Sequence, residues 1–124
     1  MGFSFDSNIP IYIQVMEDIK IKIANGEYSI NTRIEPVREL AIKYGVNPNT
    51  VQRALQELEK EELLHAERTS GRFITNDLER IDQCKTEMAE KYSEIYINHI
   101  QSLGLSIEEA IVLLQNEAMK RGVK

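Results

Sequence analysis

The sequence predicts a mainly α-helical protein with one small β-hairpin, arranged as a winged helix-turn-helix with a two-helix extension after it. Three observations predict this fold. Between Pro36 and Lys60, two segments with apolar residues at helical spacing meet at a sharp corner. Two short apolar runs separated by a turn follow the corner, and apolar residues then recur every three or four positions. We expect the winged domain over residues 9–77 and a helical tail over residues 78–124.

The composition is typical of a folded protein in a reducing compartment. Hydrophobic residues make up 42% and charged residues 28% of the 124 positions. A single cysteine, Cys84, excludes an internal disulfide framework. The first residues do not form a secretory signal, and no apolar run approaches the ~20 residues of a membrane span. We therefore expect a cytoplasmic protein without membrane contact.

The first helix is expected to begin at Pro10, which suits a helix start, and to end at Gly26. It carries no group with evident chemistry, so its expected role is to support the corner. The following segment, from Glu27 to Glu35, is polar and is expected to be irregular. The inward positions of the first helix recur at spacings of three and four. They are Tyr12, Val15, Met16, Ile19 and Ile23.

The corner has residues that favour the start and the end of the first helix and the start of the second. Pro36 suits the opening turn of the first helix, and Gly45 can take the left-handed conformation that ends it. Asn47 is expected to cap the second helix, with Pro48 at its first position, where the missing N–H is not needed. The inward stripe of that second helix is Val51, Ala54, Leu55 and Leu58.

Four polar residues near the start of the second helix lie off this stripe: Asn49, Thr50, Gln52 and Arg53. Amides, a hydroxyl and a guanidinium at a helix N-terminus can pair with base edges and phosphates in a DNA major groove, and the helix dipole favours phosphate oxygens. The alternative is an ordinary helical hairpin with a solvated face, because helix corners are common.

The charge balance does not by itself indicate a nucleic-acid partner, since the net charge is -5. Residues 33–72 contain seven basic and seven acidic side chains. Four glutamates crowd the far end of the second helix, whereas Arg38 and Arg53 belong to the end that would face a groove. This segregation permits docking by one end of the helix and predicts weak non-specific binding by a single subunit.

After the corner, residues 63–66 and 71–75 are predicted to be strands, joined by a turn over residues 68–71. The second corner helix is expected to end near Glu62, and Gly71 can supply the positive φ that such turns need. The hairpin would be the wing, and its Arg68 and Arg72 could reach a DNA backbone or a minor groove.

Four blocks of sequence carry a family resemblance: PIYxQV from Pro10, VRELA from Val37, GVNPNTVQRA from Gly45 and GRFI from Gly71. With these blocks in this order, residues 9–77 resemble the DNA-binding domain of GntR-type bacterial transcription regulators. The NPNTVQRA version and the short tail resemble the YtrA-like subfamily. The resemblance implies a repressor-like regulator that binds an inverted-repeat operator as a homodimer.

The resemblance also implies residue roles. Arg38 matches a DNA-contacting arginine, Asn49 and Thr50 match polar contact positions, and Gly71 matches a wing-tip glycine. Many members carry arginine where this chain has Pro48 and Gln52, so their base preference does not transfer. A serine that caps the first corner helix in the family is also missing, and Glu35 or Thr32 would have to replace it. The full set of expected DNA-binding residues is Arg38, Asn47, Asn49, Thr50, Gln52, Arg53, Gly71 and Arg72.

The tail is predicted to contain a long helix from Leu78 to Gly104 and a second helix that opens with a capping box of Ser106 and Glu109. Two helices alone cannot bury both apolar faces, whereas pairing with the tail of a second copy can. The alternative is that both helices fold back onto their own winged domain. The expected dimerisation residues are Met88, Tyr92, Ile95, Tyr96, Ile100, Leu103, Ile111 and Leu114.

The expected function is therefore sequence-specific regulation of transcription, with double-stranded DNA and a second copy of the chain as partners. An enzyme is not expected, because the sequence has neither a phosphate loop nor a cluster of metal ligands, and no cofactor or metal is predicted. A small-molecule effector would need a site between subunits, lined by Met88, Tyr92 and Tyr96. The rival function is a winged-helix module that binds a protein, whose binding would lack the steep salt dependence of DNA binding.

Overall fold

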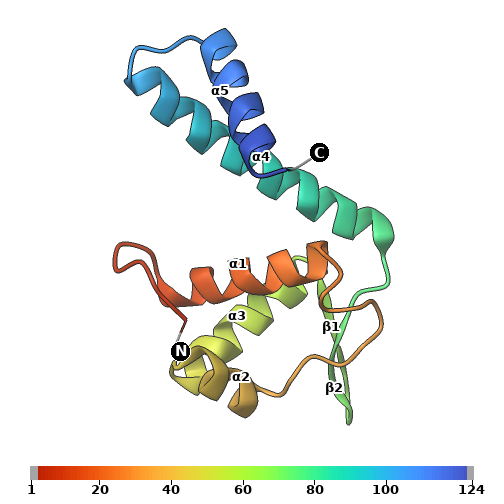
Figure 1. The fold of residues 1–124 in the computed structure, drawn as a ribbon. Coiled ribbons are helices and arrows are strands. Elements are labelled where there is room, and N and C mark those ends of the chain that lie inside the picture. The colour runs from red at the N-terminus through yellow and green to blue at the C-terminus, as the bar shows by residue number, and fades with distance from the viewer. Residues whose placement is uncertain (1–2, 123–124) are drawn as a thin grey trace. The chain divides into compact units, whose positions relative to one another are not determined.

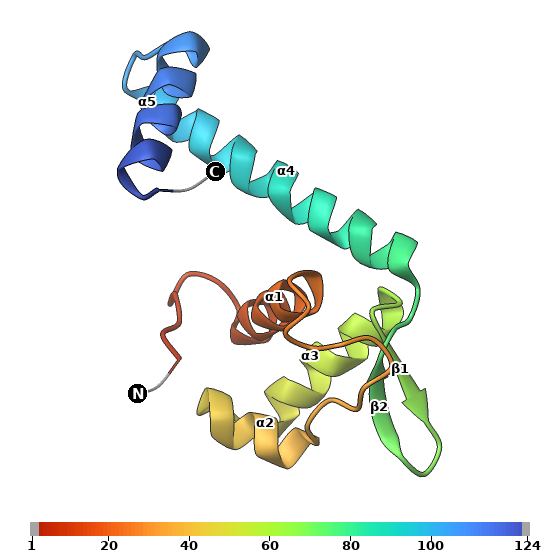
Figure 2. The same ribbon diagram turned by 45° about the vertical axis from the view of Figure 1, so that its right-hand side comes forward.

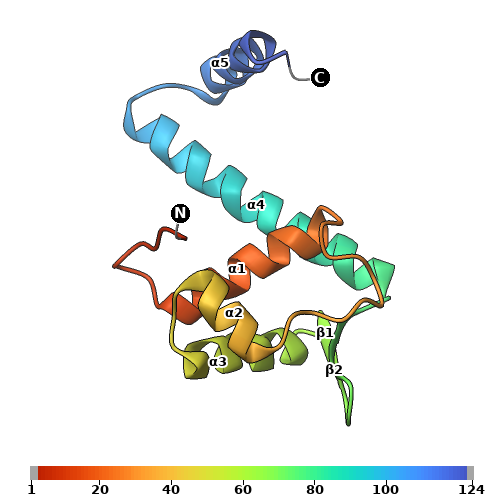
Figure 3. The same cartoon turned by 60° about the horizontal axis from the view of Figure 1, so that its bottom comes forward.

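The computed structural model describes residues 3–122, so the expected tail ends two residues beyond the described part. Within this range the chain forms five helices and one antiparallel hairpin, and the predicted winged helix-turn-helix with two further helices is confirmed (Figures 1–3). The chain divides into two compact units, the first ending at Lys85 and the second beginning at Thr86. The elements are α1 (Ile11–Ala24), α2 (Val37–Tyr44), α3 (Pro48–Lys60), β1 (Leu64–Glu67), β2 (Gly71–Ile74), α4 (Leu78–Ser102) and α5 (Ile107–Lys120).

The core of the first unit forms where α3 packs against both α1 and α2 (Figure 2). The inward stripe predicted for α3 is confirmed, since all four of its apolar residues are buried. On α1 the predicted stripe is also buried, except that Tyr12 remains half-exposed. Each fully buried aliphatic side chain contributes roughly 1.5–3 kcal/mol through loss of contact with water. The largest fully buried side chains are Ile19, Leu40, Leu55, Leu58, Leu63, Ile74, Val15 and Val51.

The corner between α2 and α3 has the predicted geometry. Gly45 ends α2 with a φ of +68°, and the Asn47 side-chain oxygen accepts a hydrogen bond of 2.8 Å from the backbone N–H of Asn49. Pro48 is the first residue of α3. Because the cap and the proline fix the first turn, the start of α3 is held in one orientation.

The side-chain cap expected for α2 is wrong. No side chain caps α2, because the Glu35 carboxylate accepts from Lys43 at 3.2 Å and the Thr32 hydroxyl donates to the Ser29 carbonyl at 2.6 Å. Helix α3 ends at Lys60, with Glu61 as its cap, close to the end expected near Glu62, and Glu62 has a φ of +61° that turns the chain toward the hairpin.

The wing pairs with one segment more than expected. β1 and β2 pair from Leu64 opposite Ile74 to Glu67 opposite Gly71. The segment before α2, expected to be irregular, also pairs with β2. The Ile34 N–H donates to the Arg72 carbonyl at 2.9 Å, and the Ile74 N–H donates to the Thr32 carbonyl at 2.9 Å. Strand β2 is therefore hydrogen-bonded on both edges, by β1 on one side and by residues 31–34 on the other.

The second unit contains the later turns of α4 and the whole of α5. The predicted capping box is confirmed: the Glu109 N–H donates to the Ser106 hydroxyl at 3.1 Å, and the Ser106 N–H donates to the Glu109 carboxylate at 3.0 Å. Between the helices, Gly104 has the predicted helix-ending conformation, with a φ of +81°. Among residues 3–122, no helix is both long enough and apolar enough to cross a membrane.

Candidate nucleic-acid interface

The outer face of α3 is polar and open to solvent. Burial of the apolar stripe turns the opposite side of the helix outward, where Asn49, Arg53 and Gln56 are exposed. Thr50 and Gln52, at the edges of this face, are half-buried. Amide and guanidinium groups can donate to base edges and to phosphates, so the face has the chemistry of a DNA-reading surface. Gln56, one turn beyond Gln52, was missed by sequence reasoning, although its spacing from Asn49 and Arg53 places it on the same face.

Arg38 lies on α2, the helix before α3, and is exposed. Within residues 3–122 its guanidinium has no hydrogen bond and no ion pair. A charged group without an intramolecular partner breaks no ion pair when it meets a phosphate, and the five N–H donors of a guanidinium suit phosphate oxygens. Arg38 is therefore available for an anionic partner.

Asn47 was expected to contact DNA, and its side-chain oxygen is used as the helix cap. The hydrogen bond to Asn49 ties Asn47 to the first turn of α3, the turn that carries the exposed Asn49 and the half-buried Thr50 side chains. Asn47 therefore positions these side chains, whatever else it contacts.

Arg53 lies against the ring of Tyr12 on α1. The guanidinium carbon is 3.9 Å from the ring centroid, and Nη2 donates to the Tyr12 hydroxyl at 3.3 Å. Although Arg53 is exposed, its side chain is held in one place. Sequence reasoning identified Arg53 and missed Tyr12, because 41 positions separate the two residues.

The wing places its two arginines in different settings. Arg68 is exposed in the hairpin turn. Arg72 is half-buried and forms an ion pair with Glu59 of α3, which ties the wing to the end of that helix. Gly71 has a φ of +101°, and a Cβ at this position would lie 2.8 Å from Nε of Arg33. The Arg33 side chain therefore packs on the backbone of the turn, and sequence reasoning missed it because the bridge between Arg33 and Phe73 was not predicted.

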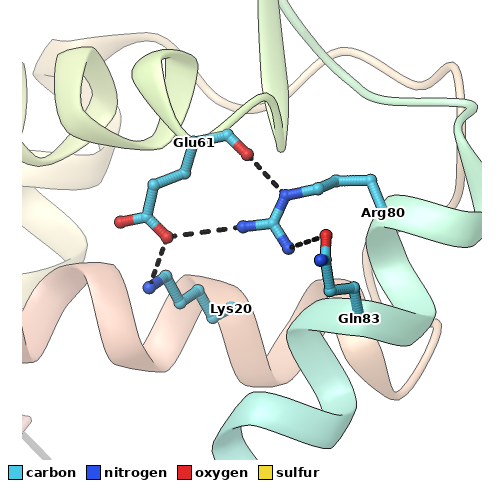
Figure 4. A network of polar contacts seen from close by, with 4 residues as sticks. All are labelled: Lys20, Glu61, Arg80 and Gln83. Atoms are coloured by element: carbon cyan, nitrogen blue, oxygen red, sulfur yellow. Dashed lines mark hydrogen bonds and ion pairs between the residues drawn. The ribbon is translucent and has the colours of Figure 1, made fainter.

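Three of the four glutamates at the far end of α3 are paired with basic side chains. Glu57 pairs with Lys60 at 3.0 Å, and Glu59 pairs with Arg72. Glu61 accepts from Lys20 of α1 at 2.7 Å and lies 3.7 Å from Arg80 of α4 (Figure 4). Arg80 also donates to the Glu61 carbonyl at 2.7 Å. These pairs offset the negative charge that would otherwise repel a phosphate backbone.

The apolar residues of the tail leave large exposed areas in the single chain. On α5, Ile111 is 51% and Leu114 56% exposed, and before it Leu103 is 73% exposed. On α4, Tyr92 and Ile95 are exposed. The other three predicted dimerisation residues, Met88, Tyr96 and Ile100, are half-buried. Apolar side chains this exposed on one compact unit are typical of an interaction surface.

Across residues 3–122, no group of three or more histidine, cysteine, aspartate and glutamate side chains could hold a metal ion.

Comparison with protein families gives a match over residues 11–74 to the family described as bacterial regulatory proteins, gntR family. Among curated proteins, the chain is 32% identical to YhcF of Bacillus subtilis (strain 168), an HTH-type transcriptional regulator, over 90% of this chain and 92% of YhcF. It is also 35% identical to the HTH-type transcriptional repressor YtrA of the same strain, over 57% of this chain and 55% of YtrA.

Two solved structures are informative. A GntR family transcriptional regulator from Listeria monocytogenes superposes with a TM-score of 0.84 at 37% identity, over 90% of this chain and 98% of that one. The DNA-binding domain of AraR, solved in complex with operator ORE1, superposes with a TM-score of 0.53 at 27% identity, over 60% of this chain and 94% of that one. The first similarity extends through most of the tail, and the second is limited to a shorter part of the chain.

Proposed function

Because this chain belongs to the GntR family of bacterial regulatory proteins, we propose that it represses transcription by binding an inverted-repeat operator as a homodimer. The family assignment confirms the resemblance carried by the four sequence blocks. The chain is accordingly a transcriptional regulator with a DNA-binding domain.

The observation that carries the proposal is the outer face of α3. Its start is fixed by the Asn47 cap, its apolar side is buried, and its exposed side offers amides and a guanidinium. We place this face in the major groove, with Asn49, Thr50, Gln52 and Arg53 nearest the bases and phosphates. The operator complex of the similar AraR domain supports DNA binding by a domain of this fold.

Arg38 and the wing would orient the subunit on the duplex. The unpaired guanidinium of Arg38 suits a phosphate, and the turn at Gly71, with Arg68 beside it, suits a backbone or minor-groove contact. Arg72 would act on the position of the wing through its ion pair with Glu59.

The dimer in the proposal rests on the exposed apolar residues of the tail, which a second copy would cover. Two linked subunits gain effective concentration, which compensates for the weak phosphate attraction of a chain with net charge -5. Two-fold symmetry then predicts half-sites about one helical turn, or a little more, apart.

Repression is proposed because the similar YtrA is a repressor. An effector site between subunits, lined by Met88, Tyr92 and Tyr96, stays a prediction.

The test begins with selection of a binding site from a random duplex library, followed by comparison of Arg38→Ala with Lys85→Ala. Each variant loses one exposed basic side chain, and Lys85 lies outside the proposed interface. We expect Arg38→Ala to weaken operator binding and to leave the dimer intact. The slope of the logarithm of the binding constant against the logarithm of the salt concentration should become shallower by about one. Lys85→Ala should bind as the wild type does.

Equal binding by the two variants, or loss of the dimer in Arg38→Ala, would remove Arg38 from the interface. A wild-type chain that selects no site and shows no salt-sensitive binding to duplex DNA would overturn the proposed function and favour a protein-binding module.

A further inference from the structure

We propose that Tyr12 is a positioning residue for DNA binding: its ring holds the Arg53 guanidinium on the outer face of α3, oriented for a DNA phosphate. The inference rests on the proposed function and extends it to α1, a helix for which the sequence indicated only a supporting role. Tyr12 itself is not expected to touch DNA through this role.

The geometry is that of a stacked cation on an aromatic face. The 3.9 Å between the guanidinium carbon and the ring centroid is well inside the ~6 Å range of cation–π attraction. The hydrogen bond from Nη2 to the Tyr12 hydroxyl is long, at 3.3 Å, so the stack is the main contact. Tyr12 lies in the first turn of α1, and α1 is fixed to the core by the buried Val15 and Ile19.

Stacking leaves the charge of Arg53 available. A guanidinium that uses its flat face against a ring keeps its edge N–H groups for oxygen acceptors. Within the described residues 3–122, Arg53 has no carboxylate partner, whereas Arg72 on the wing is paired with Glu59. The two arginines therefore differ in use: Arg72 is tied inside the fold, and Arg53 is oriented toward solvent with its charge uncompensated.

Such positioning favours binding because an unrestrained arginine loses much rotamer freedom when it meets a phosphate. An arginine that is already held in one orientation loses less rotamer freedom on binding. More of the free energy of its contact with the phosphate therefore contributes to affinity. A purely structural role is the competing explanation, in which the stack only ties α1 to α3. The two explanations differ in whether the effect of Tyr12 on DNA binding requires Arg53.

A double-mutant cycle on the full chain separates them. Four proteins are compared for binding to the selected duplex across a salt series: wild type, Tyr12→Leu, Arg53→Ala and the double variant. We expect Tyr12→Leu to weaken binding roughly two- to fivefold, the range of an exposed cation–π contact. In the Arg53→Ala background the same change should have no effect on binding. Tyr12→Phe, which keeps the ring and loses the hydroxyl, should stay close to wild type.

Melting temperatures of all variants show whether a loss of binding follows a loss of fold. Additive effects of Tyr12→Leu and Arg53→Ala on binding, or binding that is unchanged or tighter in Tyr12→Leu, would overturn the inference and leave the proposed function standing. A wild-type chain that binds no duplex would overturn both.

Discussion

At the scale of single residues, the surface of α3 depends on side chains that are themselves held by others. Asn47 caps the helix, Tyr12 holds Arg53, and Glu59 holds Arg72. Only the first of these contacts is local in sequence, since the other two join residues 41 and 13 positions apart. Local chemistry therefore predicts the cap and the exposed residues of α3, while the partners of the arginines become visible only in the folded chain.

The Asn47 cap can be tested by substitution. Asn47→Ala removes the acceptor for the Asn49 N–H and should lower the free energy of unfolding by about 1 kcal/mol, whereas Asn47→Ser, which can cap, should lower it less. Urea denaturation of both variants measures the difference. Equal stability of the alanine variant and the wild type would show that the cap does not hold the start of α3.

The buried hydroxyl of Tyr44 should make the free energy of unfolding depend on pH in the alkaline range. Its hydroxyl donates to Asp18 at 2.6 Å, and burial, aided by that carboxylate, raises the pKa of Tyr44 above its usual value of 10.0. Because the folded state favours the neutral phenol, this stability is present below about pH 10 and is lost as pH rises through the folded pKa. Burial raises the pKa of Tyr28 in the same direction.

We therefore expect the free energy of unfolding to fall as the pH rises above about 10, and to fall less steeply in Tyr44→Phe. Urea midpoints measured across this range test the expectation. Identical slopes in the two proteins would mean that Tyr44 does not contribute to the loss.

At the scale of elements, the start of α4 belongs to the winged unit. Ile81 and Cys84 are buried in it, and Arg80 joins the end of α3 through Glu61 (Figure 4). The period of apolar residues predicts α4 well, because a helix is a local structure. It does not show where the compact unit ends, which depends on contacts with residues distant in sequence, such as that of Arg80 with Glu61. The pairing of residues 31–34 was missed for the same reason, since its hydrogen bonds go to β2, which is distant in sequence.

The contribution of these first turns of α4 can be measured with two shortened chains, one ending at residue 77 and one at residue 85. Both lack the second unit, so they differ only in residues 78–85. The longer chain should unfold at a clearly higher urea concentration, because it keeps the buried Ile81 and the Arg80 contacts, and burial of an isoleucine alone contributes roughly 1.5–3 kcal/mol. Equal midpoints would place the end of the stable unit before α4.

At the scale of the whole molecule, the proposed dimer explains why a chain with net charge -5 would bind DNA. The exposed apolar residues of the tail are the physical reason to expect a second copy. The apolar pattern predicts these residues from sequence, since helical spacing places them on one side. The pattern does not identify the surface that covers these residues, because that surface belongs to another copy of the chain in the proposed dimer.

Leu114→Glu tests the tail surface, with Gln115→Glu as a matched control, because both positions are exposed on α5 and both changes add one negative charge. We expect Leu114→Glu to halve the mass in solution and to weaken binding to a two-half-site operator by at least tenfold, since the subunits are no longer linked. The control should remain dimeric. A dimeric Leu114→Glu protein would move the interface away from this face of α5.

The most direct test of the central claim is the mass of the complex between the full chain and its selected duplex, measured by light scattering. The proposed function predicts two chains on one duplex, with the recovered site an inverted repeat. One chain per duplex on a single half-site would contradict the homodimeric operator complex.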